Sequence, residues 1–416
     1  MTRVDPEKPA APRIASHAAC FDAAGQLAPW TSWRKALDLE MSHYRGCPLD
    51  RGYPRFGYVT FLDSRFVPHP NRTDTIPATQ IGTGILSYLK YAAMVPAAAD
   101  HAHATARALG DYLVKESLTP DTGKYPRFTR STGTRERFPL PADAGSQGDR
   151  PFEIEPDKGG IAGFALALLS EIGGQGYLDQ ALQNARVLAA NQGRGDAFRS
   201  PWPFRADFRS GEPRGEVSGN MTYILRLYDA LMARGFDEFA APRADLWDWI
   251  RRYQMASAAS DGALFAQFFE DHETPSNRTA WAPLNLARYL LEQRNRLEPL
   301  WREHASVLIE FVRRTFTHRE FGVTVCHEQD EDQQAWGGVV TTYGAVLAMY
   351  AKAVGAATLA QEARHALDFA LYNIDAQGCP RDVFTNPEPG GWQEDAHTDV
   401  VHNYVDALGA YPEWGG

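Results

Sequence analysis

One kind of helix recurs along the chain about every 60 residues after the first gap, and this repeat restricts the folds that the sequence can adopt. Six segments combine helix-type apolar spacing with many glycine and alanine residues, and they begin at Thr79, Asp157, Ser218, Arg278, Gly337 and Thr398. A helix that is apolar over most of its circumference is buried on nearly all sides. The sequence therefore predicts six buried helices.

A second, amphipathic helix follows each of the first five buried ones, within residues 97–117, 177–192, 239–255, 297–316 and 357–373. Such pairs form a repeated αα-hairpin. An earlier helix at residues 32–46 is placed to pair with the last buried helix. We predict an all-α protein with an (α/α)6 toroid, or a variant with seven helix pairs. A single catalytic domain is expected at residues 31–416, after an N-terminal extension at 1–30.

The connections between the predicted helices are unequal in length. Each buried helix leads into its amphipathic partner through a short turn, whereas the return to the next buried helix is long: 117–156, 193–217, 256–277, 316–337 and 373–397. TPR and HEAT superhelices have shorter repeats with short connections at both ends. The long loops should gather at one end of the ring, which we call the mouth. Long loops usually carry function, so the mouth is the expected site.

The composition excludes several classes of protein. A net charge of -10 argues against nucleic-acid or membrane-surface partners, which require a basic face. The four cysteines lack the spacing of a zinc site or a disulfide framework, and no apolar run is long enough to span a membrane. The first 25 residues lack the apolar stretch of a signal peptide. A cytoplasmic location is expected, or a periplasmic or secreted one if a leader has been removed.

The first two long loops are rich in arginine and aromatic residues. The first contains Tyr125, Arg127 and Arg130 and ends at Asp157 and Lys158; the second contains Arg199, Trp202, Arg205, Arg209 and Arg214 and ends at Asn220. Arginine binds carboxylates with a planar fork, and flat aromatic rings support sugar rings. This combination suits an anionic polysaccharide. The alternative is that the arginines pair with Asp196, Asp207, Glu212 and Glu216 and only hold the loop in place.

The remaining loops add candidates for catalysis. The third carries Glu270, Asp271, His272, Asn277 and Arg278; the fourth carries His327, Glu328 and Trp336 before Tyr343; the fifth leads to Trp392, His397, His402 and Tyr404. His397 and His402 do not share a helix face, so no metal site is predicted. We expect no cofactor.

Two mechanisms fit these residues. Cleavage of a uronate chain by β-elimination needs a neutraliser for the carboxylate, a base and an acid; Asn220, His272, Tyr343 and Arg278 supply such a set. Hydrolysis needs two carboxyl groups, for which Asp157 with Glu270 or Asp271 are the candidates.

Four short motifs, "DKGGIAG", "SPWPFR", "GNMTYILRLYD" and "FFEDHE", carry a resemblance. The chain resembles the helical-toroid carbohydrate-active enzymes, a class with unsaturated glucuronyl hydrolases and several polysaccharide lyases, and more narrowly a bacterial lyase family acting on alginate and glucuronan. This resemblance implies Tyr343 as the acid, with Asn220 and His272 at the carboxylate. Tyr223, Tyr289 and Tyr404 also lie on predicted inner helices and compete with Tyr343.

The sequence therefore predicts a polysaccharide lyase that cleaves a uronic-acid-containing polymer or oligosaccharide. The remaining residues predicted to bind substrate are Arg127, Arg130, Lys158, Trp202, Arg205, Arg278, His327, Trp336 and His402. A glycoside hydrolase of the same fold and a noncatalytic αα-solenoid are the alternatives.

Overall fold

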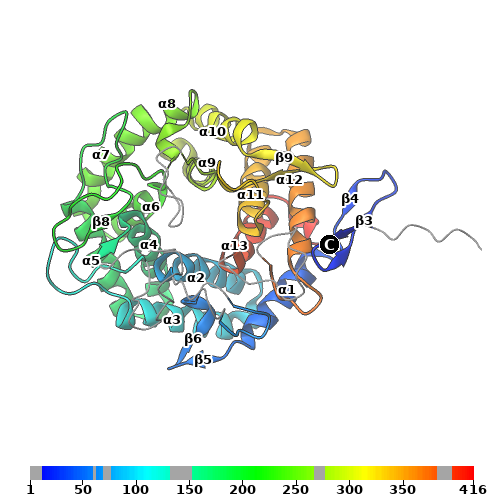
Figure 1. Cartoon of the computed structure of the whole chain (residues 1–416), viewed down its shortest axis with the longest axis horizontal. Coiled ribbons are helices and arrows are strands. Elements are labelled where there is room, and N and C mark those ends of the chain that lie inside the picture. Colours follow the sequence, from blue (N-terminus) through cyan, green and yellow to red (C-terminus); the bar gives the residue numbers. More distant parts are fainter. Residues whose placement is uncertain (1–11, 60–61, 69–75, 132–151, 267–276, 382–395) are drawn as a thin grey trace, which may run out of the picture.

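Two concentric layers of helices form a ring (Figure 1). The computed structural model describes residues 12–59, 62–68, 76–131, 152–266, 277–381 and 396–416. In these ranges the inner layer consists of α2 (Pro77–Met94), α4 (Pro156–Gly173), α6 (Thr222–Met232), α9 (Trp281–Gln293), α11 (Gly337–Val354) and α13 (Ala396–Ala410).

The outer layer supplies one partner for each inner helix: α1 (Trp33–Arg45), α3 (Ala99–Glu116), α5 (Gln175–Ala190), α7 (Ala240–Trp249), α10 (Trp301–Thr315) and α12 (Ala357–Ala370). A π-helical turn at Ile250–Gln254 joins α7 to the short α8 (Met255–Ala258). The inner layer closes on itself because α13 packs against both α11 and α2. The predicted (α/α)6 toroid is confirmed, with six helix pairs rather than seven in the described part of the chain.

Glycines allow the inner helices to approach one another closely. A Cβ atom at Gly82 of α2 would lie 2.6 Å from Cγ2 of Ile161 in α4, and one at Gly160 would lie 2.6 Å from Cγ1 of Ile224 in α6. Real Cβ atoms do not tolerate such contacts, so any other residue would push these helices apart. The glycine-rich composition of the buried helices is thus a condition for closing the ring.

The long connections meet at the end of the ring where the inner helices begin. Strand β7 (Glu153–Ile154) in the first connection pairs antiparallel with β8 (Ala206–Asp207) in the second. A bridge between Thr279 and Gln329 joins the third connection to the fourth. The fourth also contains a hairpin of β9 (Thr317–Glu320) and β10 (Val323–Cys326). These pairings join the first connection to the second, and the third to the fourth, at the mouth.

Short hairpins near the N-terminus pack on the outside of the ring. These are β1 (Arg13–Ile14) with β2 (His17–Ala18), and β3 (Cys20–Phe21) with β4 (Leu27–Ala28). The hydroxyl of Tyr372, just beyond α12, accepts from the backbone N–H of Cys20 and donates to the carbonyl of Ala28. A further pair, β5 (Leu49–Asp50) with β6 (Tyr53–Pro54), follows α1. None of the helices described has both the length and the apolar character needed to cross a lipid bilayer.

Candidate active site

Charged side chains from four inner helices converge inside the ring. Lys90 of α2 forms an ion pair with Asp406 of α13, with Nζ 2.6 Å from Oδ1. Arg226 of α6 pairs with Glu292 of α9 at 2.7 Å. We use the name interior cluster for these residues together with three others that contact them; its members are Lys90, Arg226, Arg288, Glu292, His402, Asn403 and Asp406.

Arg288 links two inner helices that are not neighbours in the ring. From α9 its Nη1 donates to Nδ1 of His402 in α13 at 3.1 Å, and its Nη2 donates to Oδ1 of Asn403. Asn403 in turn donates to the hydroxyls of Thr341 and Thr342 in α11, at 3.0 and 2.9 Å. The guanidinium is therefore held in one orientation by α11 and α13. Its Nε is buried and has no hydrogen-bond partner among the described residues.

The contact with Arg288 fixes the protonation of His402. A guanidinium only donates hydrogen bonds, so Nδ1 of His402 must accept and the neutral ring carries its proton on Nε2. Burial, and then the positive charges of Arg288, Lys90 and Arg226, hold the pKa of His402 well below its usual value. His402 is thus a neutral imidazole that can donate a hydrogen bond from Nε2, a state that polarises carbonyl or carboxylate oxygens in other enzymes.

The interior cluster has a surplus of positive charge. Lys90, Arg226 and Arg288 are opposed by Glu292 and Asp406, which leaves one net positive charge in a chain whose formal net charge is -10. Burial alone would raise the pKa of Asp406, but the charges of Lys90 and Arg288 outweigh burial and lower it. A buried positive surplus favours an anionic ligand.

A small apolar cluster adjoins these charges. Leu86, Ile161 and Tyr223, from α2, α4 and α6, form a buried group that is separate from the main core. The guanidinium of Arg226 lies 5.8 Å from the centre of the Tyr223 ring and 5.7 Å from that of Phe164. Aromatic and aliphatic side chains therefore border the interior cluster at Arg226.

Asp157 and Asn220 lie together where α4 and α6 begin. The Asp157 carboxylate is buried, and it accepts from the Lys158 N–H at 2.9 Å and from the Ser218 hydroxyl at 3.1 Å. Ser218 also accepts from the backbone N–H of Asn220 at 3.4 Å. The side-chain oxygen Oδ1 of Asn220 is buried and has no partner in the described residues. An orphaned buried amide oxygen can accept a hydrogen bond only from a donor such as a sugar hydroxyl, whereas a carboxylate would have to bind the N–H of the same amide.

The structure does not bring Tyr343 together with Asn220. The Tyr343 hydroxyl is directed to the outer layer and donates to Oε1 of Glu362 in α12 at 2.5 Å. Burial, and then the charge of Glu362, raise the pKa of Tyr343. Tyr289 donates to Asp229, and Tyr404 donates to the carbonyl of Leu367. Of the four tyrosines considered from the sequence, Tyr223 is the one that belongs to the apolar cluster inside the ring.

Most of the loop arginines pair with acids, as the alternative interpretation of the sequence expects. Trp202 is fully buried and donates to the carbonyl of Leu188 at 3.0 Å, so its ring is part of the core. Arg130 donates to the carbonyl of Leu118, and the Arg127 side chain is exposed. The ion pairs are Arg199 with Glu216, Arg205 with Glu155, Arg209 with Asp207, Arg214 with Glu212 and Arg278 with Asp330.

Three further residues that the sequence predicts to bind substrate are Lys158, Trp336 and His327, and the structure shows what each of them contacts. Lys158 is buried beside Asp157 at the start of α4. Trp336 donates to Asp332 at 3.0 Å. His327 is buried next to Phe316 and His318; burial and then the charge of His318 lower its pKa to about 4, and its Nδ1 has no partner in the described residues.

Several candidates lie outside the described residues: Glu270, Asp271, His272 and Trp392, and the side chain of His397. The described residues contain no group of three or more histidine, cysteine or carboxylate side chains that could hold a metal ion. Sequence reasoning missed Arg288, Asn403 and most of the interior cluster. The available signal was a charged residue within an otherwise buried helix, as at Lys90, Arg226 and Arg288.

Comparison with known proteins supports the architecture. No family model and no curated protein sequence matches the chain. A sugar epimerase from a ruminal bacterium aligns over 90% of this chain and 98% of its own, with a TM-score of 0.65 and 13% identity. A D-mannose isomerase aligns over 89% of this chain and 96% of its own, with a TM-score of 0.63 and 12% identity.

An unsaturated glucuronyl hydrolase specific for heparin is similar over 91% of this chain and 95% of its own, with a TM-score of 0.55 and 11% identity. The predicted resemblance to helical-toroid carbohydrate-active enzymes is confirmed at the level of the fold, whereas these structures give no specific support to an alginate or glucuronan lyase. The chain has the (α/α) toroid fold that these sugar-processing enzymes share.

Proposed function

We propose that the protein is a carbohydrate-active enzyme that binds a uronate-containing saccharide inside the ring and cleaves it by β-elimination. The observation that carries the proposal is the contact of Arg288 with His402 and Asn403 within a positively charged interior. Arg288 supplies a buried guanidinium whose Nε has no hydrogen-bond partner among the described residues, and His402 supplies a neutral imidazole that can donate from Nε2. Both suit the carboxylate of a uronic acid.

The chemistry of β-elimination assigns a task to each group. A base removes the proton from C5, the released electron pair forms the C4–C5 double bond, the C4–O4 bond breaks, and an acid protonates O4. Negative charge grows on the carboxylate oxygens as the C5 proton leaves, so donors aimed at that carboxylate stabilise the transition state. Arg288 and His402 are the proposed donors, and the amide N–H of Asn220, just before α6, is proposed as a further one.

The acid is assigned to Tyr223 rather than Tyr343. Tyr223 belongs to the apolar cluster beside Arg226, whereas the Tyr343 hydroxyl is bonded to Glu362 in the outer layer. His272, which precedes α9, remains the proposed base. An apolar environment beside the acid excludes water from the proton transfer.

Hydrolysis is the second candidate function, and one observation favours it. Asp157 is a buried carboxylate at the mouth, where a glycosidase would place one of its two carboxyl groups. Its partner would be Glu270 or Asp271. The noncatalytic solenoid is disfavoured because the inner helices close into a ring instead of forming an open concave face.

One assay separates these functions. The protein is incubated with glucuronan, alginate and pectate, and ultraviolet absorbance of the C4–C5 double bond is followed together with the release of reducing ends. A lyase produces both signals in parallel. Reducing ends without the absorbance would establish hydrolysis and exclude the lyase, and the absence of both signals with all three polymers would contradict the proposed function.

A further inference from the structure

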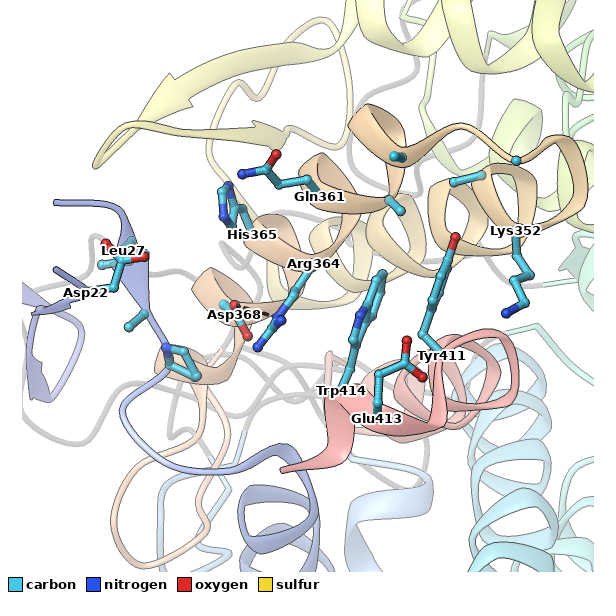
Figure 2. Close-up of a pocket in the computed structure, with 16 residues that line it drawn as sticks. Asp22, Leu27, Lys352, Gln361, Arg364, His365, Asp368, Tyr411, Glu413 and Trp414 are labelled. Carbon is cyan, nitrogen blue, oxygen red and sulfur yellow. Dashed lines mark ion pairs between the residues drawn. The ribbon is translucent and has the colours of Figure 1, made fainter. Parts of the chain in front are cut away.

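A groove of about 750 Å³ lies on the outside of the ring, at the seam between the N-terminal and C-terminal segments of the chain. One wall is a stripe of α12 that includes Ala360, Arg364 and Asp368; the others are the β3–β4 hairpin and the C-terminal turn η8 (Pro412–Gly415). We call it the seam groove. In Figure 2, Arg364 is drawn between Asp368 and the ring of Trp414, and Tyr411 lies beyond Trp414. The volume of the seam groove is within the range of typical small-molecule binding sites.

The seam groove is separate from the candidate active site. It includes Gly355 and Ala357, which flank the short turn from α11 to α12, and η8, which follows the C-terminal end of α13. Both lie at the end of the ring opposite the mouth. A saccharide bound to the interior cluster would therefore leave the seam groove empty.

A buried carboxylate that is paired with an arginine lines the groove. Asp368 is 4% exposed, and its Oδ1 accepts from the indole N–H of Trp33 at 2.7 Å. Its Oδ2 forms an ion pair with Nε of Arg364 at 3.7 Å. Burial raises the pKa of Asp368 to about 6. The Arg364 side chain is 52% exposed, so its remaining N–H groups can donate to a hydroxyl group of a ligand beside Asp368.

The opposite wall is rigid. The rings of Tyr411 and Trp414 stack at 4.2 Å, and Trp414 also packs edge-on against Trp33 at 5.6 Å. Each ring covers one face of the other, and Nζ of Lys352 lies 5.0 Å from the centre of the Tyr411 ring, so both rings are held in place as a wall of the groove. The hairpin above is fixed by the hydrogen bonds of Tyr372 to Cys20 and Ala28. The groove is thus formed before any ligand arrives.

The charges around the seam groove nearly cancel. Lys352 and Arg364 face Asp22, Asp368 and Glu413. Acidic and basic side chains that alternate in this way provide both acceptors and donors, which is the pattern that adjacent hydroxyl groups of a sugar require. A strongly charged ligand would gain little there.

We propose that the seam groove is a second saccharide-binding site that takes a neutral mono- to trisaccharide, with Asp368 and Arg364 binding its hydroxyl groups. The choice of a saccharide rests on the proposed function, but the site itself does not depend on the chemistry at the interior cluster. A second site would hold a polymer or its products while the active site works on another part of the chain.

The test measures binding of the neutral trisaccharides cellotriose and maltotriose by calorimetry. Ala360→Trp fills the groove, and Thr358→Trp adds the same ring to an exposed position of α12 outside the groove. We expect wild type and Thr358→Trp to bind at least one of the two sugars with a stoichiometry near one, and Ala360→Trp to lose at least tenfold in affinity. Arg364→Gln, which keeps the helix surface polar, should weaken binding in the same direction.

Two outcomes would overturn the inference: no binding of either trisaccharide to the wild type, or binding that neither Ala360→Trp nor Arg364→Gln weakens. Polymer cleavage is assayed in parallel on the same variants and should be unchanged, since neither residue lies near the interior cluster. A wild-type protein that cleaves polymer but binds neither trisaccharide would contradict only the second site. Binding that depends on the groove in a protein without cleavage activity would contradict only the proposed function.

Discussion

Arg288 and His402 come from inner helices that are separated by α11, and they meet inside the ring through a hydrogen bond of 3.1 Å. The contact joins two sides of the toroid at its centre and fixes the tautomer of the imidazole. It also creates the concentration of positive charge on which the proposed substrate class depends. The first two tests address this contact and the groups around it.

Removing the positive charge of Arg288 should change the titration of His402. In Arg288→Gln we expect the pKa of His402 to rise, because the guanidinium is the strongest of the charges that lower it, but to stay below its ordinary value because burial is the largest cause. Cleavage should fall about 100-fold through loss of a transition-state donor. NMR titration of the His402 ring measures the first effect. Arg296→Gln, an exposed change near α9, is the control and should alter neither quantity.

Asn220→Ala should lower activity without lowering the stability of the fold. The Asn220 oxygen is buried without a partner, so its removal should not lower the free energy of unfolding. Activity should fall about 100-fold if the Asn220 Nδ2–H donates to the substrate carboxylate in the transition state. Urea unfolding and initial rates are compared for wild type and variant. A variant with full activity would remove Asn220 from the site.

Two tyrosine substitutions should give opposite results. Tyr343→Phe deletes a hydroxyl bonded to Glu362, so we expect a loss of about 1–3 kcal/mol of stability with activity retained. Tyr223→Phe should abolish most of the turnover, since it removes the proposed acid. Thermal unfolding and the rate of double-bond formation distinguish the two. Inactivity of Tyr343→Phe without loss of stability would restore the assignment made from the sequence.

Glu40 of α1 should make the protein less stable at high pH. Its carboxyl group is fully buried, both oxygens lack hydrogen-bond partners in the described residues, and burial raises its pKa well above the ordinary value. A raised folded-state pKa gives stability that is fully present below the unfolded pKa and lost as pH rises through the folded pKa.

We therefore expect Glu40→Met to stabilise the protein by about 1–3 kcal/mol at pH 8 and by less at pH 5. Urea midpoints at the two pH values measure the effect. Glu303→Met, at an exposed position of α10, is the matched control. An equal effect of Glu40→Met at both pH values would show that Glu40 is not protonated in the folded state.

The ring could be predicted from the sequence because its signals are local. Helix periodicity and the positions of Gly82 and Gly160 reflect contacts between adjacent inner helices, and the unequal loops identify the mouth. The site depends on contacts between distant residues. Whether Arg205 binds substrate or Glu155, and whether Arg288 reaches His402, depends on helix rotation and on which side chains lie opposite each other. Tyr343 illustrates this limit, because an inner helix also presents one face to the outer layer.

Ring closure links the two ends of the chain to the construction of the site. Trp33 of α1 packs edge-on against Tyr404 of α13 with ring centres 5.1 Å apart, so the first and last helices become neighbours only when the toroid closes. Until α13 has docked, Arg288 has neither His402 nor Asn403 to bind, and Lys90 lacks Asp406. During synthesis the ring would remain an open arc with unpaired cations on its inner side, and the site would be assembled last.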